Sequence, residues 1–236
     1  MALLIVGGDS GHGKTTSIRN LDPKTTFIIQ IISKPLPFKG WKTNYPLMDK
    51  TTYVGNRYIL FDEEYDGKKN AAEVYLGASK RLRSILRLIA VKKPEIKTIV
   101  MDDTQYIMSY EYMARAKEKG FDRFNAIAEN FFNAVQTATS ISHEIDVVLL
   151  HHTEVVDGIR KLKTVGKLLD SMITIEGLFS MVFMTEVERV DGLNIYKFLT
   201  HSDGTNTAKT PMGMFDTDDI ENDLKVILEL IHKFDE

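Results

Sequence analysis

The residues best suited to chemistry form one short run near the start of the sequence, from Gly8 to Thr15. This run reads GDSGHGKT and fits the phosphate-binding pattern G-x-x-x-x-G-K-[ST] at every fixed position. Its glycines let successive backbone N–H groups turn toward phosphate oxygens, and a helix N-terminus adds a positive dipole end. The sequence predicts a strand at Leu3–Val6 before the run and a helix from Gly13 to about Arg19 after it, which is the context that this pattern requires.

Two side chains of this run have specific expected roles. Lys14 is expected to reach the β- and γ-phosphates of a nucleoside triphosphate, and the Thr15 hydroxyl is expected to ligate Mg²⁺. We expect the nucleotide to be ATP. The residues predicted to bind it are Gly8, Asp9, Ser10, Gly11, His12, Gly13, Lys14, Thr15 and Thr16.

A second set of candidate residues follows the apolar stretch Thr98–Met101. Asp102 comes directly after this predicted strand and is expected to orient Mg²⁺ through water, as an acidic strand does in P-loop nucleoside triphosphatases. Asp103 has two open interpretations. Either it polarises the attacking water, or it caps the helix that follows.

Two adjacent histidines follow the next apolar stretch, Ile145–Leu150. One of them is predicted to sense the γ-phosphate or its water, with His151 as the candidate. The alternatives are a metal site, for which no further ligand spacing is found, and a pair of surface histidines. His152 is the second member of the pair.

The composition limits the classes of protein to which the chain can belong. With 236 residues, of which 43% are hydrophobic and 27% charged, it fits a single globular domain over residues 1–236. A net charge of −3 gives no global attraction to nucleic acid or anionic lipid, so such a contact needs a local basic patch. There are no cysteines, which excludes disulfides and thiolate metal sites. The first apolar run is too short for a signal peptide or membrane span, so we expect a cytoplasmic protein with no membrane contact.

Strand-like and helix-like stretches alternate after the phosphate loop. The sequence predicts further strands at Thr25–Ile32, Tyr58–Asp62, Met181–Glu186 and Asn194–Thr200, with a turn at Asp191-Gly192 between the last two. It predicts helices at Ala71–Val91, at about Ser109–His143 and at Ile220–Phe234, and loops at Lys34–Thr52 and Val156–Leu168. This alternation predicts an α/β fold with a mostly parallel central sheet and helices on both faces.

The spacing between the two motifs favours one branch of P-loop proteins. Two candidate strands lie between Lys14 and Asp102. Simple nucleotide kinases place the acidic strand beside the P-loop strand, whereas the RecA-like and AAA-like branch inserts a strand between them. The additional strand favours this second branch.

In this order, the pieces resemble the RecA-core ATPases carried by bacteriophages, including RecA-like single-strand annealing proteins. The resemblance covers most of the chain and rests on GDSGHGKT at 8–15, TIVMDD at 98–103, VVLLHHT at 147–153 and NTAKTPMGMF at 206–215. It implies a shortened RecA fold that acts as a homo-oligomer with ATP at the subunit interfaces. It also implies that Lys209 reaches into the neighbouring subunit's ATP site as a trans-acting finger. The alternative is a solvated lysine in a polar turn.

The resemblance further implies a contact with single-stranded DNA in the loop after the histidines. Clustered cations among glycines suit a phosphate chain, although a basic run of this size is also found simply solvated. The residues predicted to contact DNA are Arg160, Lys161, Lys163 and Lys167.

The sequence departs from the RecA pattern after the second strand. RecA relatives place a catalytic glutamate there, but residues 30–35 read QIISKP and contain no acid. Glu63, Glu64 or Asp103 would have to substitute, and hydrolysis is expected to be slow.

The leading hypothesis is therefore an oligomeric, Mg²⁺-dependent ATPase that acts on single-stranded DNA in phage recombination, annealing or replication, in the host cytoplasm if phage-encoded. One alternative is a small-molecule or nucleoside kinase. Another is an ATP-dependent assembly or switch protein whose protein partner binds the Lys34–Thr52 loop with Trp41.

Overall fold

The strand that precedes the phosphate loop, β1 (Leu3–Gly8), is buried from Leu4 onward because its apolar side chains face both sides of the sheet. A strand buried on both faces belongs in the interior of a sheet that is covered on each side. It lies between β5 (Asp146–Val156) and β7 (Met181–Val190) and runs parallel to both.

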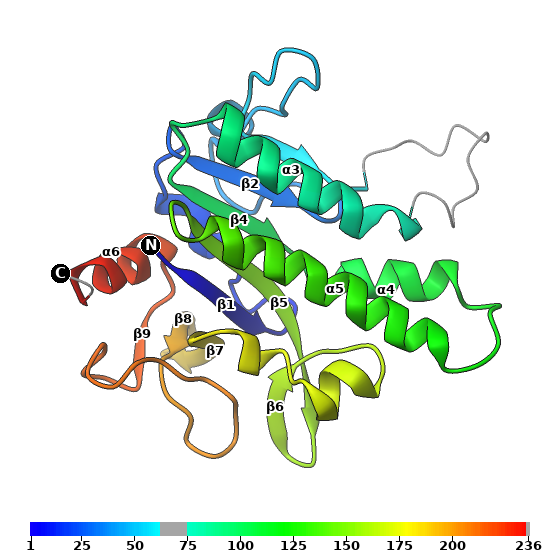
Figure 1. Cartoon of the computed structure of the whole chain (residues 1–236). Coiled ribbons are helices and arrows are strands. Elements are labelled where there is room, and N and C mark those ends of the chain that lie inside the picture. The colour runs from blue at the N-terminus through cyan, green and yellow to red at the C-terminus, as the bar shows by residue number, and fades with distance from the viewer. Residues whose placement is uncertain (62–74, 235–236) are drawn as a thin grey trace.

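The computed structural model describes residues 1–61 and 75–234, and within them one sheet has the order β3-β2-β4-β5-β1-β7-β8-β9, with β6 added beside β5 (Figure 1). The strands from β3 to β7 in this order are parallel, whereas β6, β8 and β9 are antiparallel to their neighbours. The bounds of the other strands are β2 Thr26–Gln30, β3 Arg57–Ile59, β4 Thr98–Asp102, β6 Ile159–Leu162, β8 Leu193–Leu199 and β9 Asp219–Glu221.

This strand order confirms the predicted fold class. β5 lies between the P-loop strand β1 and the acidic strand β4, which is the inserted strand of the RecA-like branch. The inserted strand is the one that carries the histidines; the two that lie between the motifs in sequence, β2 and β3, are outside β4.

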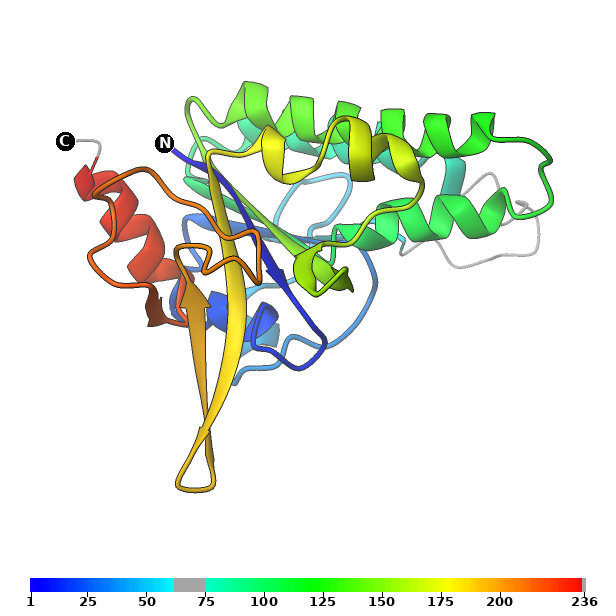
Figure 2. The ribbon, with the colours of Figure 1, turned by 90° about the horizontal axis from the view of Figure 1, so that it is seen from below.

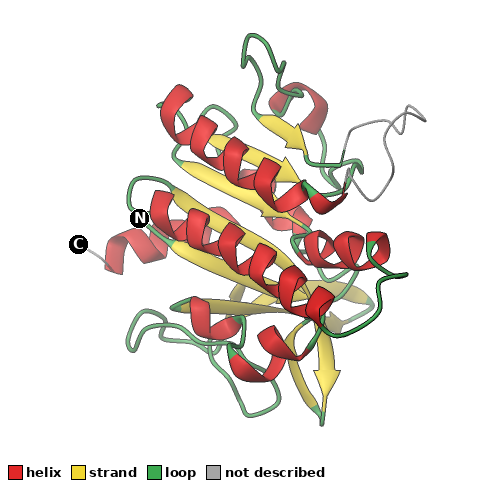
Figure 3. Cartoon of the chain, turned by 45° about the vertical axis from the view of Figure 1, so that its right-hand side comes forward, coloured by secondary structure: helices red, strands yellow, loops and turns green. Residues whose placement is uncertain are grey.

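Helices cover both faces of the sheet, as predicted (Figure 3). One face carries α3 (Ala78–Lys92), α4 (Gln105–Ala114) and α5 (Asp122–Ile141). The apolar residues of α3 recur at three- and four-residue spacing, so they form one buried stripe. The other face carries the short helices η1 (Thr15–Asn20) and α1 (Trp41–Asn44) and the C-terminal helix α6 (Leu224–Phe234). Two more short helices, η2 (Leu168–Met172) and η3 (Glu176–Leu178), lead into β7.

Several predicted elements differ from the structure. The helix after the phosphate loop is a short 3₁₀ helix, and β9 occupies the first residues of the predicted last helix. The predicted end of the third strand at Asp62, the acids Glu63 and Glu64, and the predicted start of the following helix at Ala71 lie outside the described residues.

The loop predicted at Val156–Leu168 is wrong in its first half. β5 runs six residues beyond Leu150 and pairs with β6 in an antiparallel hairpin. Its turn, Asp157-Gly158, has φ of 53° and 82°, the left-handed conformation that a two-residue hairpin turn requires. The same dipeptide, Asp191-Gly192, forms the predicted turn between β7 and β8, with φ of 50° and 82°. Figure 2 shows this second hairpin projecting away from the body of the molecule.

The segment Lys34–Thr52 has little regular structure, as predicted, but it is partly packed against the sheet. Leu36 and Tyr45 are buried in the same core as α6, and Trp41 is half-buried with the Arg57 guanidinium 5.1 Å from its ring centre. Among the described residues, no helix is both long and apolar enough to cross a membrane.

Candidate nucleotide-binding site

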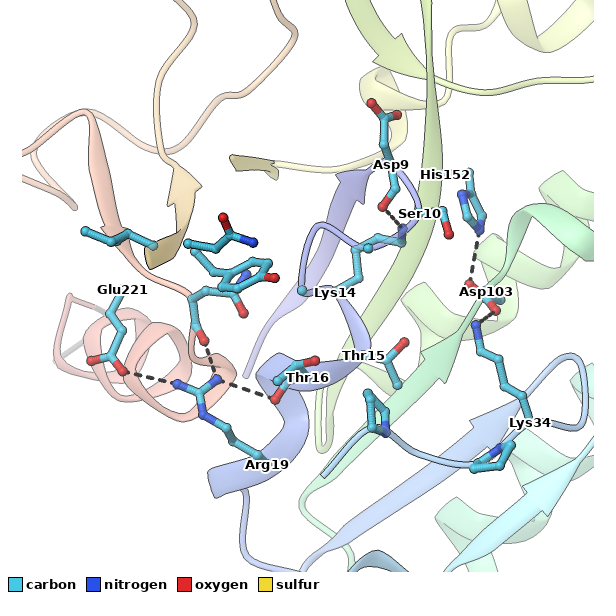
Figure 4. Close-up of a pocket in the computed structure, with 18 residues that line it drawn as sticks. Asp9, Ser10, Lys14, Thr15, Thr16, Arg19, Lys34, Asp103, His152 and Glu221 are labelled. Atoms are coloured by element: carbon cyan, nitrogen blue, oxygen red, sulfur yellow. Dashed lines mark hydrogen bonds and ion pairs between the residues drawn. The ribbon is translucent and has the colours of Figure 1, made fainter. Parts of the chain in front are cut away.

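The candidate site lies where β1 and β4 end, beside His152 of β5, which continues past this edge of the sheet. β1 and β4 both run parallel to β5, so their carboxyl ends meet at one edge of the sheet, where ligands bind in open α/β sheets. The register places Gly8 of β1 beside His152 of β5. A pocket of about 800 Å³ opens at this edge, within the usual size range of a ligand site (Figure 4). It is lined by Asp9, Ser10, Gly11, Gly13, Lys14, Thr15, Thr16, Arg19, Lys34, Pro35, Pro37, Asp103, His152, Asn194, Ile195, Tyr196, Glu221 and Asn222.

The phosphate loop forms one wall of this pocket. Of the nine residues predicted to bind nucleotide, seven line it, and Gly8 and His12 do not. Gly8 closes β1, where a Cβ would stand 1.8 Å from the Thr185 hydroxyl, so its role is to allow a close approach of β7. The His12 amide donates to the Asp9 carbonyl at 3.3 Å and tightens the loop.

Lys14 is held across the mouth of the loop. Its ammonium donates to the carbonyls of Gly8 (2.7 Å) and Asp9 (2.9 Å), and only 6% of the residue is exposed. Burial lowers the pKa of Lys14 to about 8. An anionic phosphate oxygen beside this buried cation would offset the cost of its desolvation.

Thr15 and Asp102 meet beneath the loop. The Thr15 hydroxyl donates to Oδ1 of Asp102 at 2.9 Å. Asp102 is 1% exposed, and its Oδ2 has no hydrogen-bond partner among the described residues. Burial, and next the charge of Asp103, raises the pKa of the Asp102 carboxyl.

This pair fits Mg²⁺. A hydroxyl and a carboxylate with an unpartnered oxygen are the hard oxygen ligands that the ion prefers. In the part of the chain that the structure describes, no group of three or more His, Cys, Asp or Glu could hold a metal by itself. Thr15 and Asp102 would therefore hold the ion together with phosphate oxygens and water, as is usual for Mg²⁺ bound to a nucleotide.

Asp103 does not cap the following helix, so that interpretation is wrong: α4 begins at Gln105 without a side-chain cap. Its carboxylate instead lies in the pocket, in a close ion pair with Lys34 and 3.3 Å from Nε2 of His152. Burial alone would raise the pKa of Asp103, but hydrogen bonds from His152 and Lys34 hold it below its usual range. The backbone of Asp103 is left-handed, with φ of 64°, a conformation that Asp adopts more readily than most residues.

Lys34 stands after β2, the position at which the resemblance leads one to expect a glutamate. The sequence motif indicates only that this stretch lacks an acid. The structure places a cation there that binds the Asp103 carboxylate. Sequence reasoning missed Lys34 because its partner is 69 residues away.

The two histidines have opposite surroundings. His151, the predicted phosphate sensor, is fully buried on the α5 side of the sheet and is absent from the pocket. Its Nε2–H donates to the Lys163 carbonyl, and its Nδ1 accepts from the Thr104 hydroxyl, both at 2.8 Å. Burial lowers the pKa of His151 to about 4, so this imidazole is neutral. The assignment of His151 is therefore wrong, and His152 is the histidine that lies in the pocket.

The predicted DNA-contacting residues lie outside the pocket, on the hairpin that β5 forms with β6 and just after it. Lys161 forms a close ion pair with Asp170. The Lys163 amide donates to the His152 carbonyl at 2.9 Å, which ties the hairpin to the site. The remaining two residues are Arg160 in β6 and Lys167 before η2.

Lys209 lies away from the pocket of its own chain. Its backbone pairs with Val182 near the start of β7, whereas the site lies beyond the ends of the parallel strands. The residue is exposed. A trans-acting finger need not reach its own site, so the role of Lys209 stays a prediction.

The wall opposite Asp103 comes from residues that sequence reasoning did not select. β8 supplies Asn194, Ile195 and Tyr196, and the end of β9 supplies Glu221 and Asn222. No motif marks them.

Comparison with known proteins adds a structural likeness. No protein-family model and no curated protein matches the sequence. Among solved structures, the chain is similar to the flagellar accessory protein FlaH from Methanocaldococcus jannaschii, with a TM-score of 0.42 and 14% sequence identity over 93% of this chain and 83% of that chain. The RecA-like character of the fold is visible in its own strand order.

Proposed function

We propose that this chain is a Mg²⁺-dependent ATP-binding protein and ATPase built on a RecA-like core. The observation that carries the proposal is the bond from the Thr15 hydroxyl to the buried Asp102 carboxylate, directly beneath the phosphate loop. It joins the two motifs, 87 residues apart in the sequence, at the place where a nucleotide-bound metal would lie.

In this proposal, different residues of the chain bind the phosphates, position the metal and orient the water. Lys14 and the loop amides hold the phosphates, and Thr15 with Asp102 positions the metal. Mg²⁺, when bound, neutralises charge on the β- and γ-phosphates. Asp103 is the carboxylate placed to orient a water near the γ-phosphate.

Hydrolysis by this arrangement is expected to be slow. A carboxylate whose pKa is held low by Lys34 and His152 is a weak base, and proton transfer is most efficient when the pKa is near the working pH. Lys34 occupies the position where the resemblance leads one to expect a catalytic glutamate, and residues 30–35 contain no acid.

Purified protein tests the proposal through ATP binding and turnover, each measured with Mg²⁺ and with EDTA. We expect Mg²⁺-dependent binding that Lys14→Ala weakens by about 100-fold, because a charge-assisted contact in a buried site is lost. Lys24→Ala, which removes an exposed lysine outside the pocket, is the matched control. Equal binding by wild type and Lys14→Ala would overturn the proposal.

We propose further that the protein acts on single-stranded DNA, as phage recombination, annealing or replication would require. In support, β5 carries His152 of the pocket and continues directly into the basic hairpin. Asp170 already neutralises Lys161, which leaves Arg160 and Lys163 as the stronger candidates for phosphate contact.

The salt dependence of DNA binding tests this role. Replacing Arg160, Lys161 and Lys163 together should reduce the slope of log affinity against log salt by about one for each lost phosphate contact. An unchanged slope would rule out the hairpin, and turnover indifferent to DNA at every salt concentration would favour the assembly or switch alternative.

We also propose that the protein forms homo-oligomers in which Lys209 completes a neighbour's site. Mixing Lys209→Ala with Lys14→Ala subunits should restore turnover, because some interfaces then combine an intact loop with an intact lysine. Turnover that stays at the level of the separate variants at every ratio would contradict the trans role.

The kinase alternative has less support from the pocket. Arg19 is the arginine that lines it among the described residues, and it is bonded to Glu221 and to the Asn222 carbonyl. A cluster of arginines around an acceptor is not found there.

A further inference from the structure

One end of the pocket has no role in the chemistry described above. Figure 4 shows Arg19 and Glu221 on the far side of Lys14 from Asp103 and Lys34. Here β8 and the end of β9 close the pocket, and the backbone N–H of Asn222 donates to the Tyr196 carbonyl at 3.3 Å. If the phosphates of a nucleotide lie over Lys14, its sugar and base must lie elsewhere in the pocket. The side chains that line this end differ from those around the phosphates.

Asn222 presents an unsatisfied group to this end. The residue is 3% exposed and lines the pocket, yet its side-chain Nδ2 has no hydrogen-bond partner among the described residues. Buried amides are nearly always hydrogen-bonded, so an unpartnered one beside a pocket is a candidate partner for a ligand atom or an ordered water. The amide lies against the phosphate loop, 3.2 Å from where a Cβ of Gly13 would be.

Tyr196 adds an aromatic surface next to this amide. Its ring lies 3.0 Å from the same Gly13 position, so one part of the ring rests on the phosphate loop. The residue remains 38% exposed and lines the pocket. A ring held in this way is a suitable stacking surface for a base, because every base has a π-face.

The hydrogen-bonding groups at this end favour one kind of base. The carboxylate of Glu221 is paired with Arg19 at 3.2 Å, and a second nitrogen of Arg19 donates to the Asn222 carbonyl at 2.6 Å. These bonds fix the backbone that carries Asn222. An asparagine amide offers one donor and one acceptor side by side, which match the adjacent donor and acceptor on adenine.

We propose that Tyr196 and Asn222 form an adenine-binding subsite in which the ring stacks on the base and the amide reads its edge. This inference rests on the proposed function, since it assigns the base of the nucleotide whose phosphates the loop holds. It also makes the subsite, rather than the phosphate loop, the source of selectivity for ATP over GTP.

The test compares ATP, GTP and inorganic tripolyphosphate, each with Mg²⁺, by calorimetric titration. Wild type should bind ATP at least about tenfold more tightly than GTP or tripolyphosphate. Tyr196→Ala and Asn222→Ala should each weaken ATP binding by about tenfold and leave tripolyphosphate binding unchanged, whereas Tyr196→Phe should keep wild-type affinity. Asn222→Asp should lower the ATP-to-GTP ratio.

Leu193→Ala is the matched control, because Leu193 lies on the same strand, is 72% exposed and does not line the pocket. Thermal unfolding shows whether each variant is folded. If the Asn222 variants do not fold, Tyr196→Ala, which changes a partly exposed residue, still tests the subsite. Wild type that binds ATP and tripolyphosphate equally would overturn the subsite and leave the phosphate site standing. Wild type that binds neither would overturn the proposed function as well.

Discussion

The two ends of the pocket are built by parts of one sheet that differ in strand direction. At the phosphate end, the functional side chains lie in short contiguous runs where the parallel strands β1 and β4 end and where β5 passes beside them with His152. At the other end, the antiparallel strand β8 contributes Asn194, Ile195 and Tyr196, and Glu221 and Asn222 lie at the end of β9 and just after it. Motifs therefore mark the phosphate end, and no motif marks the base end.

The two parts also contact each other directly. Gly8 lies against Thr185 of β7, and Gly13 lies against Tyr196 of β8. The phosphate loop is therefore in contact with both β7 and β8. Substitutions at these contacts can separate what the parallel and the antiparallel part of the sheet contribute to binding and stability.

The largest effect is expected at the two adjacent aspartates of the phosphate end. Asp102→Asn should reduce Mg²⁺-dependent ATP turnover by roughly 10²–10³-fold, because it removes the charge that orients the metal. Asp103→Asn should reduce turnover by less than about tenfold, since that carboxylate is already paired with Lys34. Steady-state turnover checks both, and equal losses would show that the two carboxylates do not have separate roles.

His151 should affect stability and not catalysis. Its pKa is about 4 when folded against 6.5 as its ordinary value, so the unfolded chain takes up the proton first as pH falls. Stability from this group is complete above about pH 6.5 and is lost as pH falls through about 4, by about 3 kcal/mol. His151→Gln, which keeps a donor and an acceptor but cannot titrate, should flatten this part of the curve.

The free energy of unfolding, measured against pH by denaturant titration, checks this expectation. Replacement of the exposed His143 by Gln is the control. An unchanged pH profile in His151→Gln would contradict the neutral buried state of this histidine.

A smaller effect is expected where the phosphate loop meets β7. Gly8→Ala places a Cβ 1.8 Å from the Thr185 hydroxyl and should destabilise the fold by about 1–3 kcal/mol. Thr185→Ala should restore part of this loss in the double variant, because it removes the hydroxyl, which is buried without a partner among the described residues, but keeps the Thr185 Cβ at 2.9 Å. A double-mutant cycle in urea measures the coupling, and simple additivity would show that the strands are not in contact there.

The smallest effect is expected at Arg19, which joins η1 to β9 across the two parts. Arg19→Lys loses the forked geometry that reaches Glu221 and the Asn222 carbonyl together. Because these groups are partly exposed, we expect a loss of less than about 1 kcal/mol in stability. ATP affinity should fall a few-fold while tripolyphosphate affinity holds; a matching loss for both ligands would place Arg19 in the phosphate end.

Much of the fold and of the phosphate end could be predicted from the sequence. The phosphate loop, the acidic strand end and most strands are local features, since each depends on neighbouring residues and on one period of hydrophobicity. The hairpin of β5 and β6 was equally available, because Asp157-Gly158 carries the same turn signal as Asp191-Gly192.

Which of His151 and His152 faces the pocket could not be predicted from such local features. Successive side chains of a strand point to opposite faces, so one histidine had to face the side covered by α5 and the other the opposite side. Which one faces the pocket depends on the register of β5 against β1 and on the helices that cover each face, and both are set by distant residues.

The sequence by itself determined that this protein has a phosphate loop, an acidic strand and an α/β fold, because these follow from chemistry within a few consecutive residues. Only the tertiary structure decided that Lys34 binds Asp103, that His152 and not His151 lines the pocket, and that Tyr196 and Asn222 close it. Each of these depends on which strands become neighbours in the sheet, and that outcome is settled by the packing of the whole core.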